Sequence, residues 1–382
     1  MKTIADENVP FAAEAFGRLG EAVTVPGRAM RRALIRDADA LIVRSVTRVN
    51  AALLDGTAVR FVGTATIGLD HVDVDYLRAR KIGFASAPGS NANSVAEYVV
   101  AALLVLARRG GFRLEGKTIG VVGVGNVGSR VVRMARALGM KVLENDPPLQ
   151  RQTHDPRFLP LEDLFDADVV TLHVPLTPTG PDATYHMADE RLIGCLKPGV
   201  ILINTSRGAV ADENALLQGS ESRQLGGLIL DVFENEPDIS LALVERADIA
   251  TPHIAGYSLD GKVNGTAMVY RAACDFFGWP LEWDPAAVLP EPPHPRLTAR
   301  ADCDDEDALR DLVLTVCDIE SDDTQLRKIT ELPAAERSAY FDHLRKTYPV
   351  RREFPNTTVE VTGVSMPLRE KIGGVGFRIG AF

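Results

Sequence analysis

Three polar residues with complementary chemistry follow successive β-rich segments in the middle of the chain. Arg207 lies in INTSRG, Glu236 in DVFENEP and His253 in ATPHIAG. An arginine holds a carboxylate through paired hydrogen bonds, and a histidine accepts a proton near neutral pH. A carboxylate on the far ring nitrogen orients that histidine and stabilises its charged form. Each residue alone is common at protein surfaces, but together they predict oxidation of a hydroxy acid, with Arg207 binding the acid and His253 taking the hydroxyl proton.

A glycine pattern earlier in the chain predicts a phosphate-binding turn. Gly123, Gly125 and Gly128 form GxGxxG between the apolar run TIGVV and the helical sequence SRVVRMARAL. In that context the first glycine permits a tight turn, the second leaves room for a pyrophosphate, and the third lets the helix approach the strand. The amino end of the helix then attracts phosphate through its unpaired N–H groups. Because such turns also serve packing alone, the pattern needs a second indication.

Asp146 supplies that second indication. It ends the strand-like run MKVLEND, 18 residues after Gly128. A carboxylate at this place accepts hydrogen bonds from both hydroxyls of an adenosine ribose and repels a 2′-phosphate. The predicted cofactor is therefore NAD rather than NADP. The alternative interpretation is structural, since Asp146 precedes two prolines and could simply shape a turn.

A parallel sheet is required to bring these residues to one edge. A first series of β-rich runs alternates with helix-like stretches in residues 1–93: KTIA, AVTV, ALIVRS, RFVGTATI and GFASAP. A second series follows: TIGVV, MKVLEND, ADVVTLHVPL, GVILINTSRG, LGGLILDVF and DIATPHI. Such alternation is typical of parallel sheets built from βαβ units, in which ligands bind at the carboxyl ends of the strands.

Several helices are expected around these sheets. Ser94 and Glu97 have the spacing of a capping box at the start of the longest one. Four prolines between Pro290 and Pro295 predict a linker, because proline continues neither a helix nor a central strand. After it, charged helical stretches and the strand-like TTVEVTG indicate a small α+β unit. The expected helices are at 94–109, at about 261–277, returning to the first domain, at 304–318 and near 334–346.

Composition excludes several other classes of protein. The 382 residues are 46% hydrophobic and 25% charged, enough for two or three domain cores. The net charge of -10 disfavours general binding to nucleic acid, so an anionic substrate requires a local cluster of arginines. The start, MKTIADENVP, is unlike a secretory signal, and the apolar run 99–107 is too short to span a bilayer. Four widely spaced cysteines indicate reduced thiols and no metal site, so we expect a cytoplasmic protein without a membrane partner.

The motifs GVGNVG, Asp146, SRG, DVFENEP and PHIAG, in this order, resemble the D-2-hydroxyacid dehydrogenase family. The resemblance implies an α/β protein with two Rossmann-like domains, a flavodoxin-like substrate-binding domain and an NAD-binding domain, each with a parallel sheet, and an active site in the cleft between them. It implies that Arg207 binds the substrate carboxylate, that Glu236 and His253 transfer the proton, and that Asp231 contacts the nicotinamide. The cofactor-binding residues carried over by the resemblance are Gly123, Gly125, Asn126, Val127, Gly128, Asp146, Pro175, Thr205, Ser206, Asp231 and Gly256.

Further motifs resemble one branch of that family, which acts on a phosphorylated four-carbon hydroxy acid: DENVP, VPGR, IVRSVTRVN, GTATIGLDHVD, APGSNA and HIAGYSLDGK. By this resemblance Ser45, Thr66 and Tyr257 contact the substrate. Arg44 and Arg48, on either side of Ser45, would supply positive charge for the phosphate, although Arg48 could equally be an ordinary surface residue.

The resemblance also divides the chain into domains and leaves two alternatives open. It implies a substrate-binding domain of residues 1–93 and 258–285, an NAD-binding domain of 94–257 and a C-terminal α+β dimerisation domain of 286–382, hence a homodimer. One alternative is a related dehydrogenase acting on 3-phosphoglycerate, glyoxylate or hydroxypyruvate. The other is an NAD-sensing scaffold without turnover, because such proteins retain the same motifs.

Overall fold

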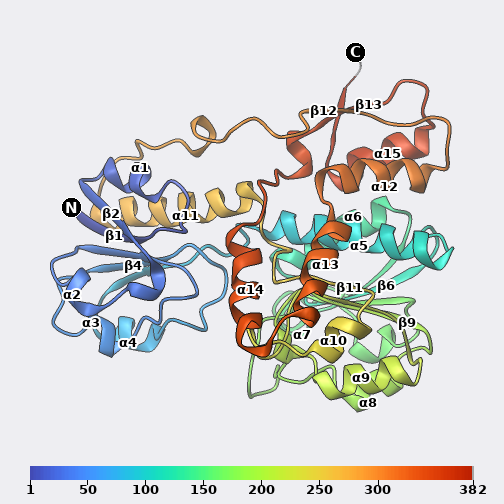
Figure 1. The fold of residues 1–382 in the computed structure, drawn as a ribbon, viewed down its shortest axis with the longest axis horizontal. Coiled ribbons are helices and arrows are strands. Elements are labelled where there is room, and N and C mark those ends of the chain that lie inside the picture. Colours follow the sequence, from blue (N-terminus) through green and yellow to red (C-terminus); the bar gives the residue numbers. More distant parts are fainter. Residues whose placement is uncertain (381–382) are drawn as a thin grey trace. The chain divides into compact units, whose positions relative to one another are not determined.

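The computed structural model of the protein describes residues 1–380 (Figure 1). The chain divides into two units. The first consists of Met1–Asn91 and Ser258–Glu291, and the second of Ala92–Tyr257 and the chain from Pro292 onward. The chain thus returns to the first unit at Ser258. The C-terminal domain predicted to end at residue 382 has its last two residues outside the described part.

The first unit is built on a five-stranded parallel sheet with the order β2-β1-β3-β4-β5, which is the flavodoxin-like order. Helix α11 packs on β4 and β5 and closes an apolar core that includes Phe16, Phe61 and Tyr270. The strands are β1 (Lys2–Asp6), β2 (Glu21–Val25), β3 (Ala40–Val43), β4 (Phe61–Thr64) and β5 (Gly83–Ala85). The helices are α1 (Ala12–Gly17), α2 (Arg32–Ile35), α3 (Ala51–Leu54), α4 (Val74–Ala79) and α11 (Leu259–Phe277).

The second unit is built on a six-stranded parallel sheet with the order β11-β10-β9-β8-β6-β7. The chain runs from β6 to β7 on one side and then to β8 on the other, so the order of strands reverses beside β6, where such sheets bind ligands. The strands are β6 (Thr118–Val122), β7 (Lys141–Asn145), β8 (Val169–Leu172), β9 (Val200–Asn204), β10 (Leu225–Leu230) and β11 (Ile249–Ala250). The helices are α5 (Ala92–Gly110), α6 (Asn126–Ala137), α7 (Pro147–Thr153), α8 (Glu190–Cys195), α9 (Glu213–Glu221) and α10 (Leu241–Arg246).

Both faces of this sheet are buried, because side chains alternate between two cores along each strand. Ile201 and Ile203 of β9 join the core that contains α5 and α6, whereas Val200 and Leu202 join the core on the opposite face. Strands covered on both sides are expected to be apolar throughout, and β9, with the sequence VILIN, is buried over its full length.

Residues 292–380 add four helices and a three-stranded parallel sheet, β12-β13-β14, to the second unit. Helix α12 packs on α5, α15 packs on α6, and α13 packs on β11. The elements are β12 (Arg296–Thr298), α12 (Asp305–Val316), α13 (Ile319–Arg327), α14 (Ala334–Lys346), β13 (Thr358–Glu360), α15 (Met366–Val375) and β14 (Arg378–Gly380).

One local prediction is wrong. Helix α5 begins at Ala92, so Ser94 and Glu97 lie inside its first turns and do not form a capping box. The Ser94 hydroxyl donates to the Ala255 carbonyl at 2.9 Å, and Glu97 pairs with Arg351 at 3.1 Å. Partners distant in sequence therefore replace the local bonds. No helix within residues 1–380 is long and apolar enough to cross a membrane.

Candidate active site

The glycine turn has the geometry that its sequence predicts. Gly123 follows β6 with φ of 86°, a conformation that side chains other than glycine disfavour. A Cβ on Gly128 would lie 1.9 Å from the Gly123 carbonyl oxygen, so helix α6 packs directly against the turn. A Cβ on Gly125 would meet no atom within 4 Å, which leaves the backbone open to a ligand. The residues present therefore fit a pyrophosphate at the amino end of α6, which starts at Asn126 and Val127.

Asp146 lies at the carboxyl end of β7, beside this turn. One carboxylate oxygen accepts from the Val124 amide at 2.8 Å, and the other caps α7 by accepting from the Leu149 amide at 3.0 Å. The cap on α7 agrees with the turn-shaping interpretation of Asp146, and the bond to Val124 places the carboxylate beside the turn predicted to bind the cofactor.

Arg207, Glu236 and His253 follow the neighbouring strands β9, β10 and β11, so the sheet brings them to one edge. The Arg207 guanidinium donates to the Ser206 carbonyl at 2.8 Å. A Cβ on Gly208 would lie 1.9 Å from the Phe233 carbonyl carbon. The turn that carries Arg207 therefore packs directly against the loop that carries Glu236.

The His253 ring and the Glu236 carboxylate form the central contact of this edge. His253 Nδ1 and Glu236 Oε2 are 2.7 Å apart, and Glu236 Oε1 accepts from the Phe233 amide at 3.0 Å. Burial works against the charge on Glu236, but attraction to His253 and these hydrogen bonds outweigh it and lower the Glu236 pKa. An ionised carboxylate can only accept, so Nδ1 carries a proton and Nε2 of the neutral ring has its lone pair free to act as a base.

The backbone around His253 is tightly fixed. His253 has φ of 57°, in the left-handed region, where strain is typical of functional sites. The buried Asp231 carboxylate holds this loop by accepting from the Thr251 hydroxyl at 2.7 Å and from the Ile254 and Ala255 amides at 2.8 and 2.9 Å. Burial raises the pKa of Asp231 to about 6 despite these bonds.

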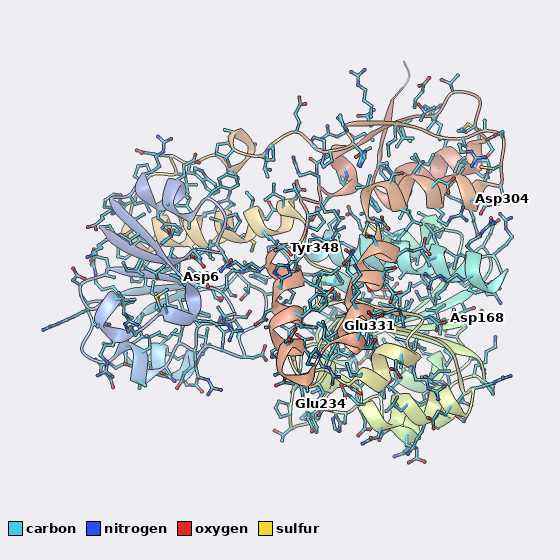
Figure 2. All side chains as sticks on the ribbon, viewed as in Figure 1. Asp6, Asp168, Glu234, Asp304, Glu331 and Tyr348 are labelled. Carbon is cyan, nitrogen blue, oxygen red and sulfur yellow. The ribbon has the colours of Figure 1, made fainter. Side chains whose placement is uncertain are left out.

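The same loop as Glu236 has a second histidine–carboxylate contact. Glu234, labelled in Figure 2, accepts from His186 Nε2 at 2.9 Å. Glu213 of α9 accepts from the Glu234 amide at 3.0 Å. These bonds fix the DVFENEP segment at Glu234.

His173 is a further candidate that our sequence analysis did not select. It follows β8, and its ring contacts the Thr171 hydroxyl at 2.9 Å and the Thr205 hydroxyl at 3.4 Å. Burial lowers the pKa of His173 to about 3, so the ring is neutral at pH 7. Its position in TLHVPL, at the end of a predicted strand, was a usable signal.

The remaining predicted cofactor residues lie on loops at the same edge of this sheet. Pro175 follows β8, and its carbonyl accepts from the Thr184 hydroxyl. Thr205 and Ser206 follow β9, where Ser206 donates to the Asn204 side chain at 2.8 Å. Gly256 lies in the loop after His253.

The predicted substrate residues of the first unit also follow strands. Arg44 and Ser45 come directly after β3, and the Arg44 guanidinium donates to the Asn8 carbonyl at 3.2 Å. Thr66 follows β4 and shares a 2.7 Å hydrogen bond with Thr64. Asp6 ends the adjacent strand β1 and is labelled in Figure 2. These side chains therefore lie at the carboxyl edge of the first sheet.

Tyr257 belongs to the second unit and contacts the C-terminal segment. Its ring meets that of Tyr348 edge to face, with centroids 6.0 Å apart. The guanidinium carbon of Arg345, from α14, lies 5.6 Å from the centre of the same ring. A residue predicted to touch the substrate is thus packed against side chains from the end of the chain.

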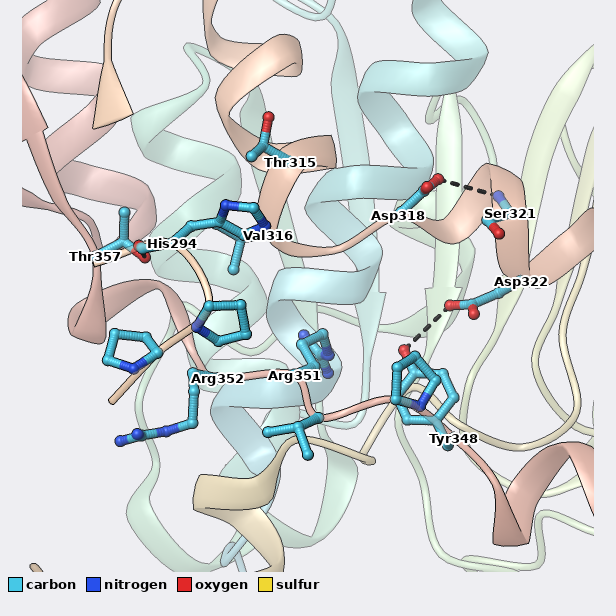
Figure 3. Close-up of a pocket in the computed structure, with 14 residues that line it drawn as sticks. His294, Thr315, Val316, Asp318, Ser321, Asp322, Tyr348, Arg351, Arg352 and Thr357 are labelled. Atoms are coloured by element: carbon cyan, nitrogen blue, oxygen red, sulfur yellow. Dashed lines mark hydrogen bonds between the residues drawn. The ribbon is translucent and has the colours of Figure 1, made fainter. Parts of the chain in front are cut away.

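Arg351 fixes this segment to the helix α5 and to the loop after His253. Its side chain is only 4% exposed; it pairs with Glu97 at 3.1 Å and donates to the Ala255 carbonyl at 3.0 Å. Figure 3 shows Arg351 in the wall of a cavity of about 220 Å³, with Tyr348 donating to Asp322 at 3.1 Å. Burial raises the pKa of Asp322 to about 7.

No group of three or more His, Cys, Asp or Glu side chains within residues 1–380 is arranged to hold a metal ion. The four cysteines are free thiols.

Comparison with known families gives two matches. Residues 99–255 match the D-isomer specific 2-hydroxyacid dehydrogenase, NAD binding domain, and residues 288–373 match a domain of unknown function, DUF3410. The first match contains strands β6 to β11 and the residues Arg207, Glu236 and His253.

Curated relatives match over nearly the full chain. Erythronate-4-phosphate dehydrogenase of Yersinia enterocolitica is 46% identical over 98% of both chains, and the enzyme of the same name from Cronobacter sakazakii is 48% identical over 98% of both. Among solved structures, NAD+-bound 3-phosphoglycerate dehydrogenase of Entamoeba histolytica is 27% identical, with a TM-score of 0.63 over 73% of this chain and 95% of that one. The TT0316 protein of Thermus thermophilus is also 27% identical, with a TM-score of 0.63 over 74% of this chain and 99% of that one.

Proposed function

The chain belongs to the erythronate-4-phosphate dehydrogenases of the D-isomer specific 2-hydroxyacid dehydrogenase family, and we propose that it oxidises 4-phospho-D-erythronate. It is an NAD-dependent dehydrogenase with two Rossmann-like parallel sheets. The product would be 3-hydroxy-2-oxo-4-phosphooxybutanoate, as a step in the synthesis of pyridoxine 5′-phosphate. The 46–48% identity to enzymes of this name over 98% of the chain carries the proposal.

In the proposed reaction the chain's own residues bind, orient and deprotonate the substrate. Arg207 holds the carboxylate, which fixes the C2 hydrogen in one direction. His253 Nε2 takes the proton of the C2 hydroxyl, because Nδ1 is committed to Glu236 at 2.7 Å. The ionised Glu236 then stabilises the positive charge that develops on the ring.

When bound, NAD+ would supply the acceptor for the hydride that leaves C2. The glycine turn and the first residues of α6 would hold its pyrophosphate, and Asp146 its adenosine ribose. Pro175, Thr205, Ser206, Asp231 and Gly256 would complete the cofactor site at the same edge of the sheet.

We assign the remaining roles as follows. The first unit provides substrate contacts through Ser45, Thr66 and Arg44, with Arg44 toward the phosphate, and the second unit adds Tyr257. The C-terminal segment serves dimerisation, so that the working form is a homodimer. The four free thiols are typical of the reducing cytoplasm, where we place the enzyme.

The test of the substrate is NADH formation under single-turnover conditions, so that slow product release does not mask the chemistry. Reactions with 4-phospho-D-erythronate are compared with reactions with 3-phospho-D-glycerate. A clear preference for the four-carbon acid supports the proposal. Preference for 3-phosphoglycerate would leave the assigned catalytic residues unchanged but would show that the substrate assignment is wrong. Binding of NADH without turnover of any hydroxy acid would indicate a scaffold protein.

The role of His253 has its own test. Replacing it with alanine removes the base, and we expect hydride transfer to slow by roughly a hundredfold or more. NADH binding, followed by its fluorescence, should be unchanged because no predicted cofactor contact is lost. Turnover close to that of the wild type would refute the assignment.

A further inference from the structure

The C-terminal segment places a half-buried arginine against the ring of Tyr257. Arg345 lies near the end of α14, inside the match to the domain of unknown function. Its guanidinium carbon is 5.6 Å from the centre of the Tyr257 ring and 5.9 Å from that of Phe341. Burial opposes its charge, but attraction to Tyr257 and Glu236 outweighs burial and raises the Arg345 pKa. The cation therefore lies against Tyr257, a residue predicted to contact the substrate.

The hydrogen bonds of this arginine are incomplete. Its Nε atom is buried and has no hydrogen-bond partner among residues 1–380. Both oxygens of the nearby Glu236 are already committed, one to the Phe233 amide and the other to His253. A buried N–H without an acceptor costs free energy, so Nε is open to a further acceptor although the guanidinium already hydrogen-bonds Tyr257.

The chemistry of that acceptor follows from the surroundings. A planar guanidinium binds phosphate through parallel hydrogen bonds, and its charge persists at any working pH. The phenol of Tyr257 adds a neutral donor next to it. The protein as a whole carries a net charge of -10, so a phosphorylated, anionic substrate needs local cations.

We propose that Arg345, supplied by the C-terminal segment, is a substrate-binding residue that recognises the phosphate group of the hydroxy acid. The inference rests on the proposed function and deepens it. It gives the segment of unknown function a direct part in substrate selection, next to Tyr257. The carboxylate remains with Arg207, and Arg345 adds a second cation to Arg44 for the phosphate.

The test compares two substrates that differ only in the phosphate. Arg345→Met removes the charge and keeps an apolar stem, and kcat/KM is measured for 4-phospho-D-erythronate and for D-erythronate. We expect kcat/KM for the phosphorylated acid to fall about 10- to 100-fold, mainly through KM, which is the usual loss for a charged hydrogen bond. D-erythronate turnover should change less than about twofold. Arg345→Lys, which keeps the charge without the planar fork, should be intermediate.

Lys346→Met is the matched control, because Lys346 is the next residue of α14 and is exposed. It should leave both substrates unaffected. Competition by inorganic phosphate gives a readout of binding, and its inhibition constant should rise in Arg345→Met and not in the control. Circular dichroism verifies that each variant is folded.

Two results would overturn the inference. An equal fall for both substrates would mean that Arg345 acts on Glu236 rather than on phosphate. No fall for either substrate would mean that it serves packing alone. If the wild type itself does not prefer 4-phospho-D-erythronate, the proposed function is wrong. The wild-type result therefore tests the proposed function, and the Arg345 variants test the inference.

Discussion

Replacing Glu236 with glutamine tests the contact on which the proposed proton transfer depends. Glutamine has the same shape as glutamate, so its Oε1 can still accept from the Phe233 amide. At the other position an amide N–H2 would face His253 Nδ1, where the carboxylate now accepts at 2.7 Å. An amide nitrogen cannot accept, so the ring must move its proton to Nε2, which then no longer serves as a base.

The size of the effect follows from this geometry. Both side chains are mostly shielded from water, with 32% of His253 and 18% of Glu236 exposed. A hydrogen bond to a charged group is worth about 1.5–3 kcal/mol, and each 1.36 kcal/mol of barrier is a factor of ten. We therefore expect hydride transfer to slow by about 10- to 150-fold. The assay is single-turnover NADH formation with saturating NAD+, and NADH affinity serves as the control. A rate within about threefold of the wild type, with NADH affinity intact, would refute the assigned role of Glu236.

Three further predictions concern the scaffold of the site. Gly128→Ala places a Cβ 1.9 Å from the Gly123 carbonyl oxygen, and the resulting overpacking of about 1–3 kcal/mol should weaken NADH binding about 5- to 160-fold in a calorimetric titration. Asp231 has a folded pKa of about 6, above the usual 3.9 of an unfolded chain, so the folded state binds more protons between these values. The contribution of Asp231 to the free energy of unfolding therefore falls by about 3 kcal/mol as pH rises from 4 to 6. Asp231→Asn should remove this part of the pH dependence measured by urea unfolding. Arg351→Met removes the ion-pair partner of the buried Glu97 carboxylate and should lower the free energy of unfolding in urea by about 3–5 kcal/mol. The added change Glu97→Gln should recover part of this stability.

The sequence was sufficient for the elements whose pattern is local. Strands such as β9 are continuous apolar runs, and α14 was expected near 334–346 and spans Ala334–Lys346. The glycine turn was predictable because its spacing reflects backbone geometry. The histidine and its carboxylate were predictable because parallel strands end at one edge, although their 2.7 Å contact is a result of the structure.

Contacts between distant segments were not predictable in the same way. The capping box at Ser94 failed because its side chain bonds to Ala255, 161 residues away. Arg345 lies in a charged stretch whose sequence is typical of a solvent-exposed helix, and nothing in its spacing indicates Tyr257. Helices α13 and α15 were not expected, because short, mixed segments have weak periodicity.

The first unit is built from two stretches of the chain that are far apart in sequence, and this has a consequence for synthesis on the ribosome. Residues 1–91 contain all five strands of its sheet, but part of its core comes from α11, including Val269 and Tyr270. About 170 further residues must be made before α11 emerges, which takes roughly 10–35 s at about 5–20 residues per second. During that interval the sheet exposes an apolar face, so we expect the nascent chain to engage chaperones. A fragment of residues 1–91 should accordingly lack cooperative unfolding, and adding the peptide 258–291 should restore it.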